Sequence, residues 1–138
     1  MGIVRGINVV SISVPDLDAA RAFYRDALGL GEPVYDLPGA GWVEFATGPG
    51  NGNLAVVAAE PGWAPSTGTT VVLDVDDCAA ACAALRARGV KCGDPQVFPG
   101  FVTFADVFDP FGNRLQVCGP APDADAAEND DDGTATPT

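Results

Sequence analysis

Residues 9–30 read VVSISVPDLDAARAFYRDALGL, and this stretch decides the fold. After its first residue, residues 9–14 alternate large apolar side chains with serines, which is typical of a strand with one face on a core. Residues 17–28 carry an apolar stripe at helical spacing, between Asp16, a favourable N-cap, and Gly29, a favourable helix end. The stretch therefore predicts a strand followed directly by a helix.

The same order of features returns about 60 residues later, as expected for an internal repeat. Residues 70–75 read TVVLDV and predict a second strand, and residues 76–77 supply an aspartate cap. Apolar residues at positions 78, 81, 82 and 85 predict a second helix, which Gly89 ends. Gly52-Asn53 in the first half matches Gly112-Asn113 in the second, a separation of 112 − 52 = 60 residues, and each pair predicts a hairpin turn.

Further strands complete each half of the chain. We predict an α+β fold of two tandem βαβββ modules, because one such module alone leaves a sheet face bare and two can cover each other, within one chain or across two. The remaining strands are expected at residues 41–47, 53–58, 101–108 and 113–118, with short strands near 33–36 and 95–98. The expected divisions are a first module at 1–60, a linker at 61–69, a second module at 70–119 and a disordered acidic tail at 120–138.

The charge balance limits the kinds of partner. The chain carries 19 acidic and 7 basic residues, a net charge of −12, and six of the acids follow Pro120. Nucleic acids and anionic membranes need a basic surface, so neither is an expected partner. No apolar run approaches the ~20 residues that span a bilayer, and the N-terminus lacks the pattern of a signal peptide. We therefore expect a cytoplasmic protein whose four cysteines stay reduced.

Two motifs resemble a known family. Residues 10–30 resemble the opening of modules of the vicinal-oxygen-chelate superfamily, which includes glyoxalases, bleomycin-resistance proteins and extradiol dioxygenases. Residues 108–116, FDPFGNRLQ, resemble the closing hairpin of such modules. The resemblance covers about residues 7 to 119. It implies two modules forming cupped mixed sheets, a pocket in each cup, and a homodimer in which a second chain completes the pocket.

The positions of the family's metal ligands are unusual in this chain. Family enzymes commonly hold a divalent metal through one position in the first and one in the last strand of each module. By resemblance these positions are Val9, Val56, Thr70 and Gln116. The chain has no histidine and valine has no donor atom, so we expect no family metal site and no cofactor, as in the bleomycin-resistance branch. An oxygen-only Mg²⁺ or Ca²⁺ site built from other carboxylates stays open as an alternative.

The pocket lining follows from strand alternation and the family register. Aromatic walls with a few polar groups suit a planar ligand, and carboxylates beside aromatic rings suit a cationic one. In the alternative interpretation, Glu44 and Asp74 are solvated at strand ends and Arg114 pairs with one of them. The expected ligand-binding residues are Val9, Ser11, Ser13, Trp42, Glu44, Val56, Thr70, Asp74, Phe104, Asp106, Arg114 and Gln116.

Two functions of different classes fit these features. The resemblance favours a metal-independent binding protein that sequesters an antibiotic or another aromatic or cationic small molecule, and we do not expect an enzyme. The alternative is a metal-free isomerase, cyclase or lyase in which Glu44, Asp74 or Asp106 acts as a general acid or base. A ligand sensor is a third interpretation, although no motif names an output partner.

Overall fold

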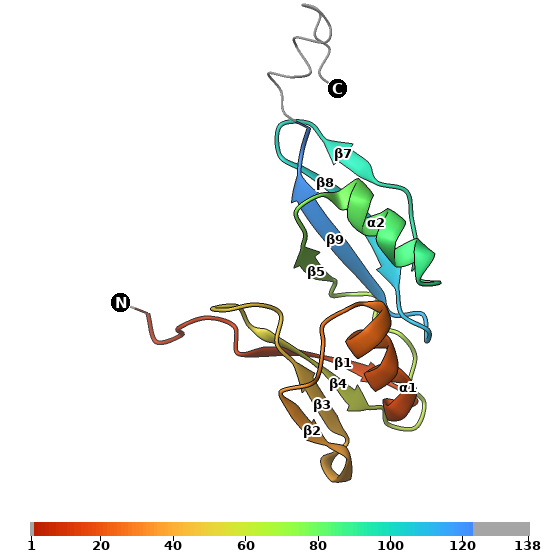
Figure 1. The fold of residues 1–138 in the computed structure, drawn as a ribbon. Helices are drawn as coiled ribbons and strands as arrows, with labels where there is room; N and C mark the ends of the chain where they lie inside the picture. The colour runs from red at the N-terminus through yellow and green to blue at the C-terminus, as the bar shows by residue number, and fades with distance from the viewer. Residues whose placement is uncertain (1, 123–138) are drawn as a thin grey trace, which may run out of the picture. The chain divides into compact units, whose positions relative to one another are not determined.

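The computed structural model describes residues 2–122 and divides the chain into two compact units (Figure 1). Unit 1 comprises Met1–Thr67 together with Asp109–Asn113, and unit 2 comprises Gly68–Phe108 together with Arg114–Thr138. The turn at Asp109–Asn113 belongs to unit 1, although the residues on either side of it in the sequence belong to unit 2. The predicted disordered tail lies outside the described residues from position 123 onward.

Unit 1 contains one mixed sheet with the strand order β1-β4-β3-β2. The edge strand β1 (Val9–Val14) runs parallel to β4 (Asn53–Ala58), whereas β3 (Trp42–Phe45) runs antiparallel to β4 and to β2 (Tyr35–Leu37). The predicted helix is α-helical in α1 (Leu17–Ala22) and π-helical in η1 (Phe23–Ala27). The loop before β3 forms a short 3-10 turn, η2 (Pro38–Ala40).

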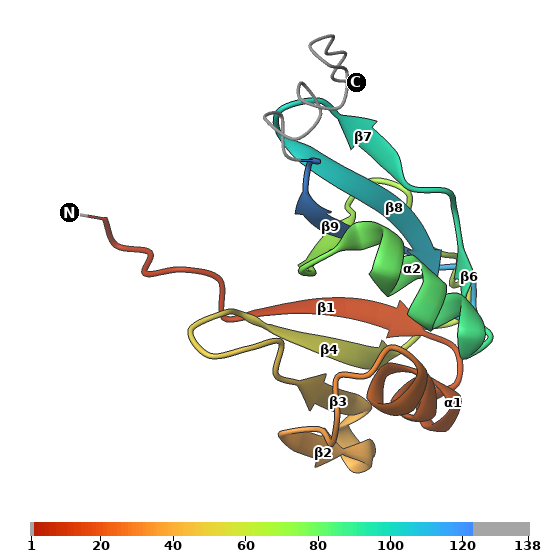
Figure 2. The ribbon, with the colours of Figure 1, turned by 45° about the horizontal axis from the view of Figure 1, so that its top comes forward.

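Unit 2 repeats this plan with one added strand. Strand β5 (Val71–Asp74) runs parallel to β9 (Arg114–Pro120), and β9 pairs antiparallel with β8 (Val102–Phe108). The other side of β8 pairs with β6 (Lys91–Cys92), which the sequence did not predict, and with β7 (Gln96–Phe98). Figure 2 shows α2 (Cys78–Ala87) lying across this sheet. The predicted α+β class and the two βαβββ modules are confirmed.

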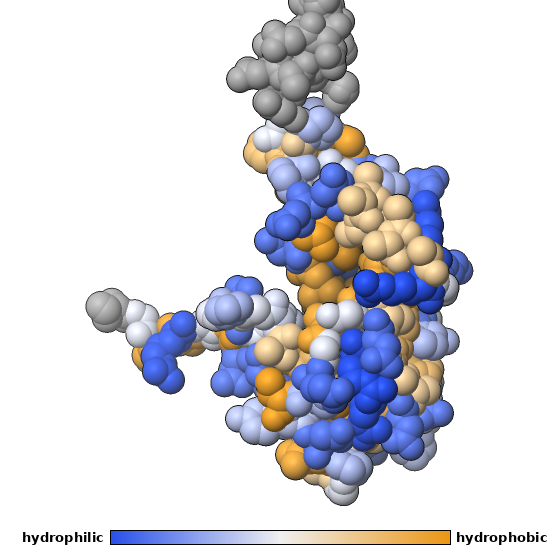
Figure 3. All heavy atoms as spheres, in the orientation of Figure 1, coloured by the Kyte–Doolittle hydropathy of each residue, from blue (hydrophilic) through white to orange (hydrophobic). Residues whose placement is uncertain are grey.

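Local chemistry places both helices where the sequence predicts them. The carboxylate of Asp16 accepts a hydrogen bond from the Ala19 amide at 3.0 Å, and that of Asp77 accepts one from the Ala80 amide at 3.0 Å. Each cap satisfies an amide that the first helical turn leaves without a partner. In α2 the buried Cys78, Cys82 and Leu85 face the sheet, and alanines cover most of the outer side, which is pale orange in Figure 3. No helix within residues 2–122 combines the length and apolar character that a bilayer span requires.

In each unit the helix covers one face of the sheet, and we call the opposite face the open face. Unit 1 buries Tyr24 and the β-strand side chains Val43 and Phe45 on its helix side, and unit 2 buries Val107 and Leu115 there. The register assigns to the open face of unit 1 Val9, Ser11, Ser13, Tyr35, Leu37, Trp42, Glu44, Asn53, Ala55 and Val57. It assigns to that of unit 2 Val72, Asp74, Gln96, Phe98, Phe104, Asp106, Arg114, Gln116 and Cys118.

The position of the first hairpin turn corrects the prediction. The turn is formed by residues 48–51, where the Asn51 amide donates to the Gly48 carbonyl at 3.1 Å, whereas Asn53 is the first residue of β4. In the second half the turn does lie before Asn113, since the Gly112 amide donates to the Asp109 carbonyl at 3.2 Å, and β9 starts at Arg114. Asn53 therefore corresponds to Arg114, so the last strands are separated by 114 − 53 = 61 residues and not by 60.

Candidate functional site

The open face of unit 1 carries a buried carboxylate. Glu44 lies on β3, and only 8% of its surface is exposed. Its Oε1 accepts a hydrogen bond from the indole Nε1 of Trp42 at 2.9 Å, and its Oε2 accepts one from the amide Nδ2 of Asn53 at 2.7 Å. We call these three residues the Trp42–Glu44–Asn53 cluster.

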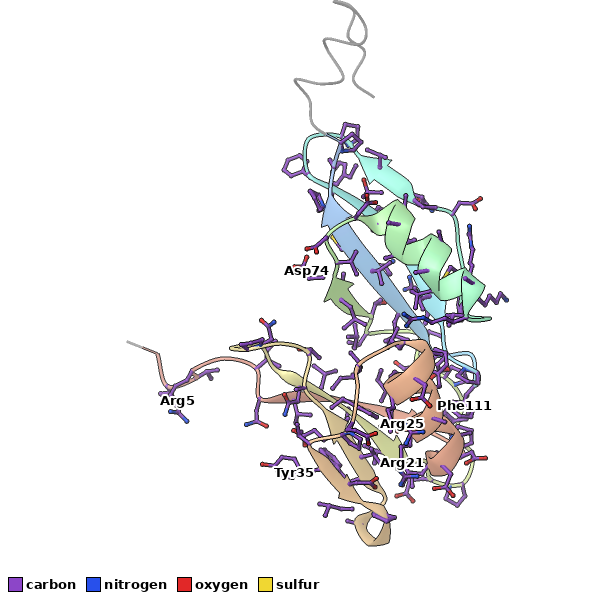
Figure 4. The ribbon with its side chains drawn as sticks, viewed as in Figure 1. Arg5, Arg21, Arg25, Tyr35, Asp74 and Phe111 are labelled. Carbon is purple, nitrogen blue, oxygen red and sulfur yellow. The ribbon has the colours of Figure 1, made fainter. Side chains whose placement is uncertain are left out.

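The side chains next to Glu44 differ in size on its two sides. In the register, Glu44 lies between Ala55 of β4 and Tyr35 of β2, and Ser11 of β1 lies beyond Ala55. Ser11 and Ala55 have short side chains, whereas Trp42 and Tyr35 carry large rings. Tyr35 is 57% exposed and is labelled on β2 in Figure 4. Glu44 is thus flanked by small residues on the β4 side and by the ring of Tyr35 on the β2 side, while Trp42 lies along its own strand.

Glu44 has no cationic partner among the ion pairs of residues 2–122. The arginines of α1 and η1 are committed elsewhere, since Arg21 pairs with Asp18 and Asp36 and Arg25 pairs with Asp26 (Figure 4). A buried carboxylate without a counter-charge is costly, and the two N–H donors offset only part of that cost. The open face of unit 1 therefore presents an uncompensated negative charge.

The open face of unit 2 carries a network that joins four predicted site residues. The Oδ1 of Asp106 accepts hydrogen bonds from Arg114 Nη1 at 3.1 Å and from Gln116 Nε2 at 3.0 Å. Arg114 also donates through Nη2 to the hydroxyl of Thr70 at 2.8 Å. The sequence interpretation in which Arg114 pairs with Glu44 or Asp74 is wrong, because its ion-pair partner is Asp106.

The other predicted carboxylates differ in their surroundings. Asp74 ends β5 and is exposed, and its side chain projects from the strand in Figure 4, so the alternative interpretation as a solvated strand-end residue fits it. Glu44 is buried, so that interpretation does not fit it. Phe104 shares a row of the open face of unit 2 with Asp74. Of the three acid–base candidates, Glu44 lies in unit 1 and the other two lie in unit 2.

The prediction that Val56 lines the open face is wrong. Val56 pairs in the register with Ile12 and Val43, is fully buried, and lies on the helix side of its sheet. Ala55 occupies the position that Gln116 has in unit 2. Because side chains alternate along a strand, the one-residue error in the repeat spacing moved the assignment to the opposite face. Val9, Ser11, Ser13 and Trp42 do share the open face with Glu44.

The donor atoms at the family's metal positions do not fit a divalent cation. Val9 and Ala55 have no side-chain donor atom, the Thr70 hydroxyl accepts from Arg114, and the Gln116 amide donates to Asp106. In the part of the chain that the structure describes, no three His, Cys, Asp or Glu side chains are grouped as a metal requires.

The cysteines do not form an activated nucleophile. All four are free thiols, and Cys78 and Cys82 are buried on the sheet-facing side of α2. Burial and the neighbouring Cys82 raise the pKa of the Cys78 thiol to about 11, and burial also raises the pKa of Cys92. A thiol reacts through its thiolate, so at neutral pH these two groups are poor nucleophiles.

Asn53 and Tyr35 are members of the site that sequence reasoning missed. Asn53 was interpreted as a turn residue, and Tyr35 lies in a short strand whose register the sequence did not determine. Aligning the starts of the two closing strands at Asn53 and Arg114 would have placed Asn53 beside a carboxylate, because Arg114 lies beside Asp106.

Comparison with solved structures finds several relatives. TnmS3, an antibiotic binding protein from Streptomyces sp. CB03234, is 27% identical with a TM-score of 0.75, over 88% of this chain and 100% of that chain. A superfamily member from Sphaerobacter thermophilus DSM 20745 is 25% identical with a TM-score of 0.73, over 85% and 98%. A lactoylglutathione lyase from Agrobacterium tumefaciens is 26% identical with a TM-score of 0.65, over 86% and 96%. No curated protein matches the chain.

The family model matches most of the chain. It describes the glyoxalase/bleomycin resistance protein/dioxygenase superfamily and covers residues 6–117, which extend from before β1 into β9. This agrees with the resemblance carried by residues 10–30 and 108–116. The chain belongs to the glyoxalase/bleomycin resistance protein/dioxygenase superfamily.

Proposed function

We propose that the chain is a metal-independent small-molecule binding protein that holds an aromatic or cationic ligand, such as an antibiotic, without altering it. The observation that carries this proposal is the Trp42–Glu44–Asn53 cluster on the open face of unit 1. A half-buried aromatic ring beside a fixed carboxylate suits a planar ligand that carries polar or positive groups.

Two further observations support binding. The relative TnmS3, at 27% identity, is an antibiotic binding protein. The ring of Trp42 is held by its hydrogen bond to Glu44, so little conformational freedom is lost when a ligand stacks on it. We further propose that the protein acts in the cytoplasm as a homodimer, in which a second chain covers part of the open faces.

A thermal-shift and calorimetric screen of the full chain tests this function. The panel contains planar cationic antibiotics, divalent metal ions and a chelator. We expect a stabilisation of several degrees with at least one planar compound and no change with metals or chelator. The Trp42→Leu variant should lose the response, whereas Phe101→Leu, at an exposed position of unit 2, should keep it. Stabilisation by a metal that the chelator reverses, with no response to planar compounds, would overturn the proposal.

A second candidate function is a metal-free lyase or isomerase with Glu44 as general base. The burial of Glu44 and the relative that is a lactoylglutathione lyase favour it. However, both carboxylate oxygens already accept hydrogen bonds from N–H groups of the protein. These bonds fix the carboxylate as an acceptor toward Trp42 and Asn53. Mass spectrometry of the ligands and of lactoylglutathione after incubation with the protein distinguishes binding from catalysis. Unchanged compounds support binding. A product that is no longer formed in the Glu44→Gln variant supports catalysis.

A further inference from the structure

The two open faces place a carboxylate at the same position of the repeat but balance its charge differently. We call β4 and β9 the closing strands of units 1 and 2. Glu44 on β3 lies opposite Ala55 of β4, and Asp106 on β8 lies opposite Gln116 of β9. The first residue of that closing strand donates to the carboxylate in both units. The geometry is therefore repeated, and only the donor differs.

The donor decides the local charge. In unit 2 it is Arg114, whose guanidinium forms an ion pair with Asp106 at 3.1 Å, so the pair is neutral overall. In unit 1 it is the uncharged amide of Asn53, and the second donor is the uncharged indole of Trp42. Glu44 is also buried, whereas Asp106 is only partly buried. The negative charge that remains uncompensated is the one that is better shielded from water.

We propose that Glu44 selects the ligand by charge, so that the open face of unit 1 takes an aromatic compound with a positively charged nitrogen in or next to its ring. This inference rests on the proposed function and names the class of ligand. The cation replaces the missing arginine and balances Glu44, while the aromatic part lies against Trp42. The face of an indole ring also attracts a cation, so both groups favour the same ligand.

The arrangement is set before a ligand arrives. Hydrogen bonds from Trp42 and Asn53 fix both oxygens of Glu44, so the carboxylate does not have to reorient to meet a cation. Burial strengthens its attraction for an opposite charge relative to a carboxylate in water. A neutral ligand of the same shape leaves the charge unbalanced and gains only the stacking on Trp42.

The test uses two probes of nearly equal shape, 10-methylacridinium, which is permanently cationic, and acridine, which is uncharged at neutral pH. Calorimetry on the full chain should show the cation bound about tenfold or more tightly than acridine, since the attraction between opposite charges a few ångströms apart at a buried carboxylate exceeds the free energy that a tenfold difference requires. Glu44→Gln should remove this preference and leave acridine binding within about twofold. Glu60→Gln is the control, because it makes the same chemical change at an exposed site and gives the same net charge of −12 + 1 = −11.

A second variant keeps Glu44 in place. Asn53→Arg supplies the counter-charge that Arg114 supplies in unit 2, and it should also abolish the preference for the cation. Equal binding of the two probes to the unaltered chain, or a preference that survives in both variants, overturns the charge selection and leaves the binding function standing. Binding of neither probe, together with no response in the antibiotic screen, overturns both.

Discussion

At the scale of single residues, buried polar groups in unit 1 serve two different purposes. Glu44 keeps a negative charge on the open face. On the helix side Asp109 is completely enclosed by donors: its Oδ2 accepts from the Tyr24 hydroxyl at 2.8 Å and from Asn113 Nδ2 at 2.8 Å. Its Oδ1 accepts from the amides of Phe111 and Asn113. Asp109 is therefore a structural carboxylate that shapes its turn.

The Tyr24→Phe variant should test this structural role. The side chain is fully buried, and burial together with Asp109 raises the pKa of the Tyr24 phenol, so the hydroxyl remains a donor throughout the ordinary pH range. Removing it leaves one acceptor site of Asp109 unsatisfied and should lower the free energy of unfolding by about 1–3 kcal/mol. Urea unfolding measures the change. Tyr35→Phe, at a 57% exposed position, is the control and should be near neutral; equal effects at both sites would contradict the assignment.

At the scale of elements, strand register decides which residues can form a site. Within unit 1, β3 and β4 pair from Phe45 with Leu54 to Trp42 with Val57, and this pairing brings Asn53 within reach of Glu44. The start of β4 is set by a close approach of two backbones, since a Cβ added at Gly52 would lie 2.6 Å from the Ile7 carbonyl oxygen. Gly52 is therefore required for packing and not for a turn.

The Gly52→Ala variant should accordingly be destabilising. The added methyl group meets backbone that cannot move aside without shifting β1 against β4, which should cost about 1–3 kcal/mol, as overpacking does. Thermal and urea unfolding give the loss, and binding of 10-methylacridinium should weaken because Asn53 is the next residue. Gly39→Ala is the matched control: its added Cβ meets nothing within 4 Å, and Gly39 is not among the glycines with positive φ. A neutral Gly52→Ala variant would contradict this account.

At the scale of the whole molecule, the proposed homodimer would cover large apolar side chains that the open faces expose. Among the described residues, ten large apolar side chains are at least 44% exposed, and four of these lie on the open faces: Tyr35, Leu37, Val72 and Phe98. Extended exposed apolar patches usually mark an interaction surface. This observation supports the proposed homodimer.

Sedimentation of the full chain should therefore give the mass of a dimer, and Val72→Asp should shift it toward the monomer. Val72 is 52% exposed on the edge strand β5, and a carboxylate buried there without a counter-charge would oppose association. Ala84→Asp introduces the same charge on the outer side of α2 and should leave the mass unchanged. A monomeric unaltered chain, or dissociation by both variants alike, would refute the dimer proposal.

Much of the fold could be read from local patterns. Alternation in residues 9–14, the aspartates that cap α1 and α2, and the apolar stripe of α2 each act over a few residues, so the βαβββ repeat and its family follow from the sequence alone. The absence of donor atoms at Val9 is likewise a property of composition and needs no structure.

Only the tertiary structure decided which side chains meet. Val56 lies on the helix side and Asn53 lies in the site, contrary to the prediction from the sequence. Register depends on hydrogen bonds between strands that are distant in sequence, and a shift of one residue exchanges the two faces. The different charge balance of Glu44 and Asp106 arises in the same way, since their donors Asn53 and Arg114 come from another strand. Sequence patterns specify elements through short-range preferences, whereas the site depends on long-range pairing that those preferences do not encode.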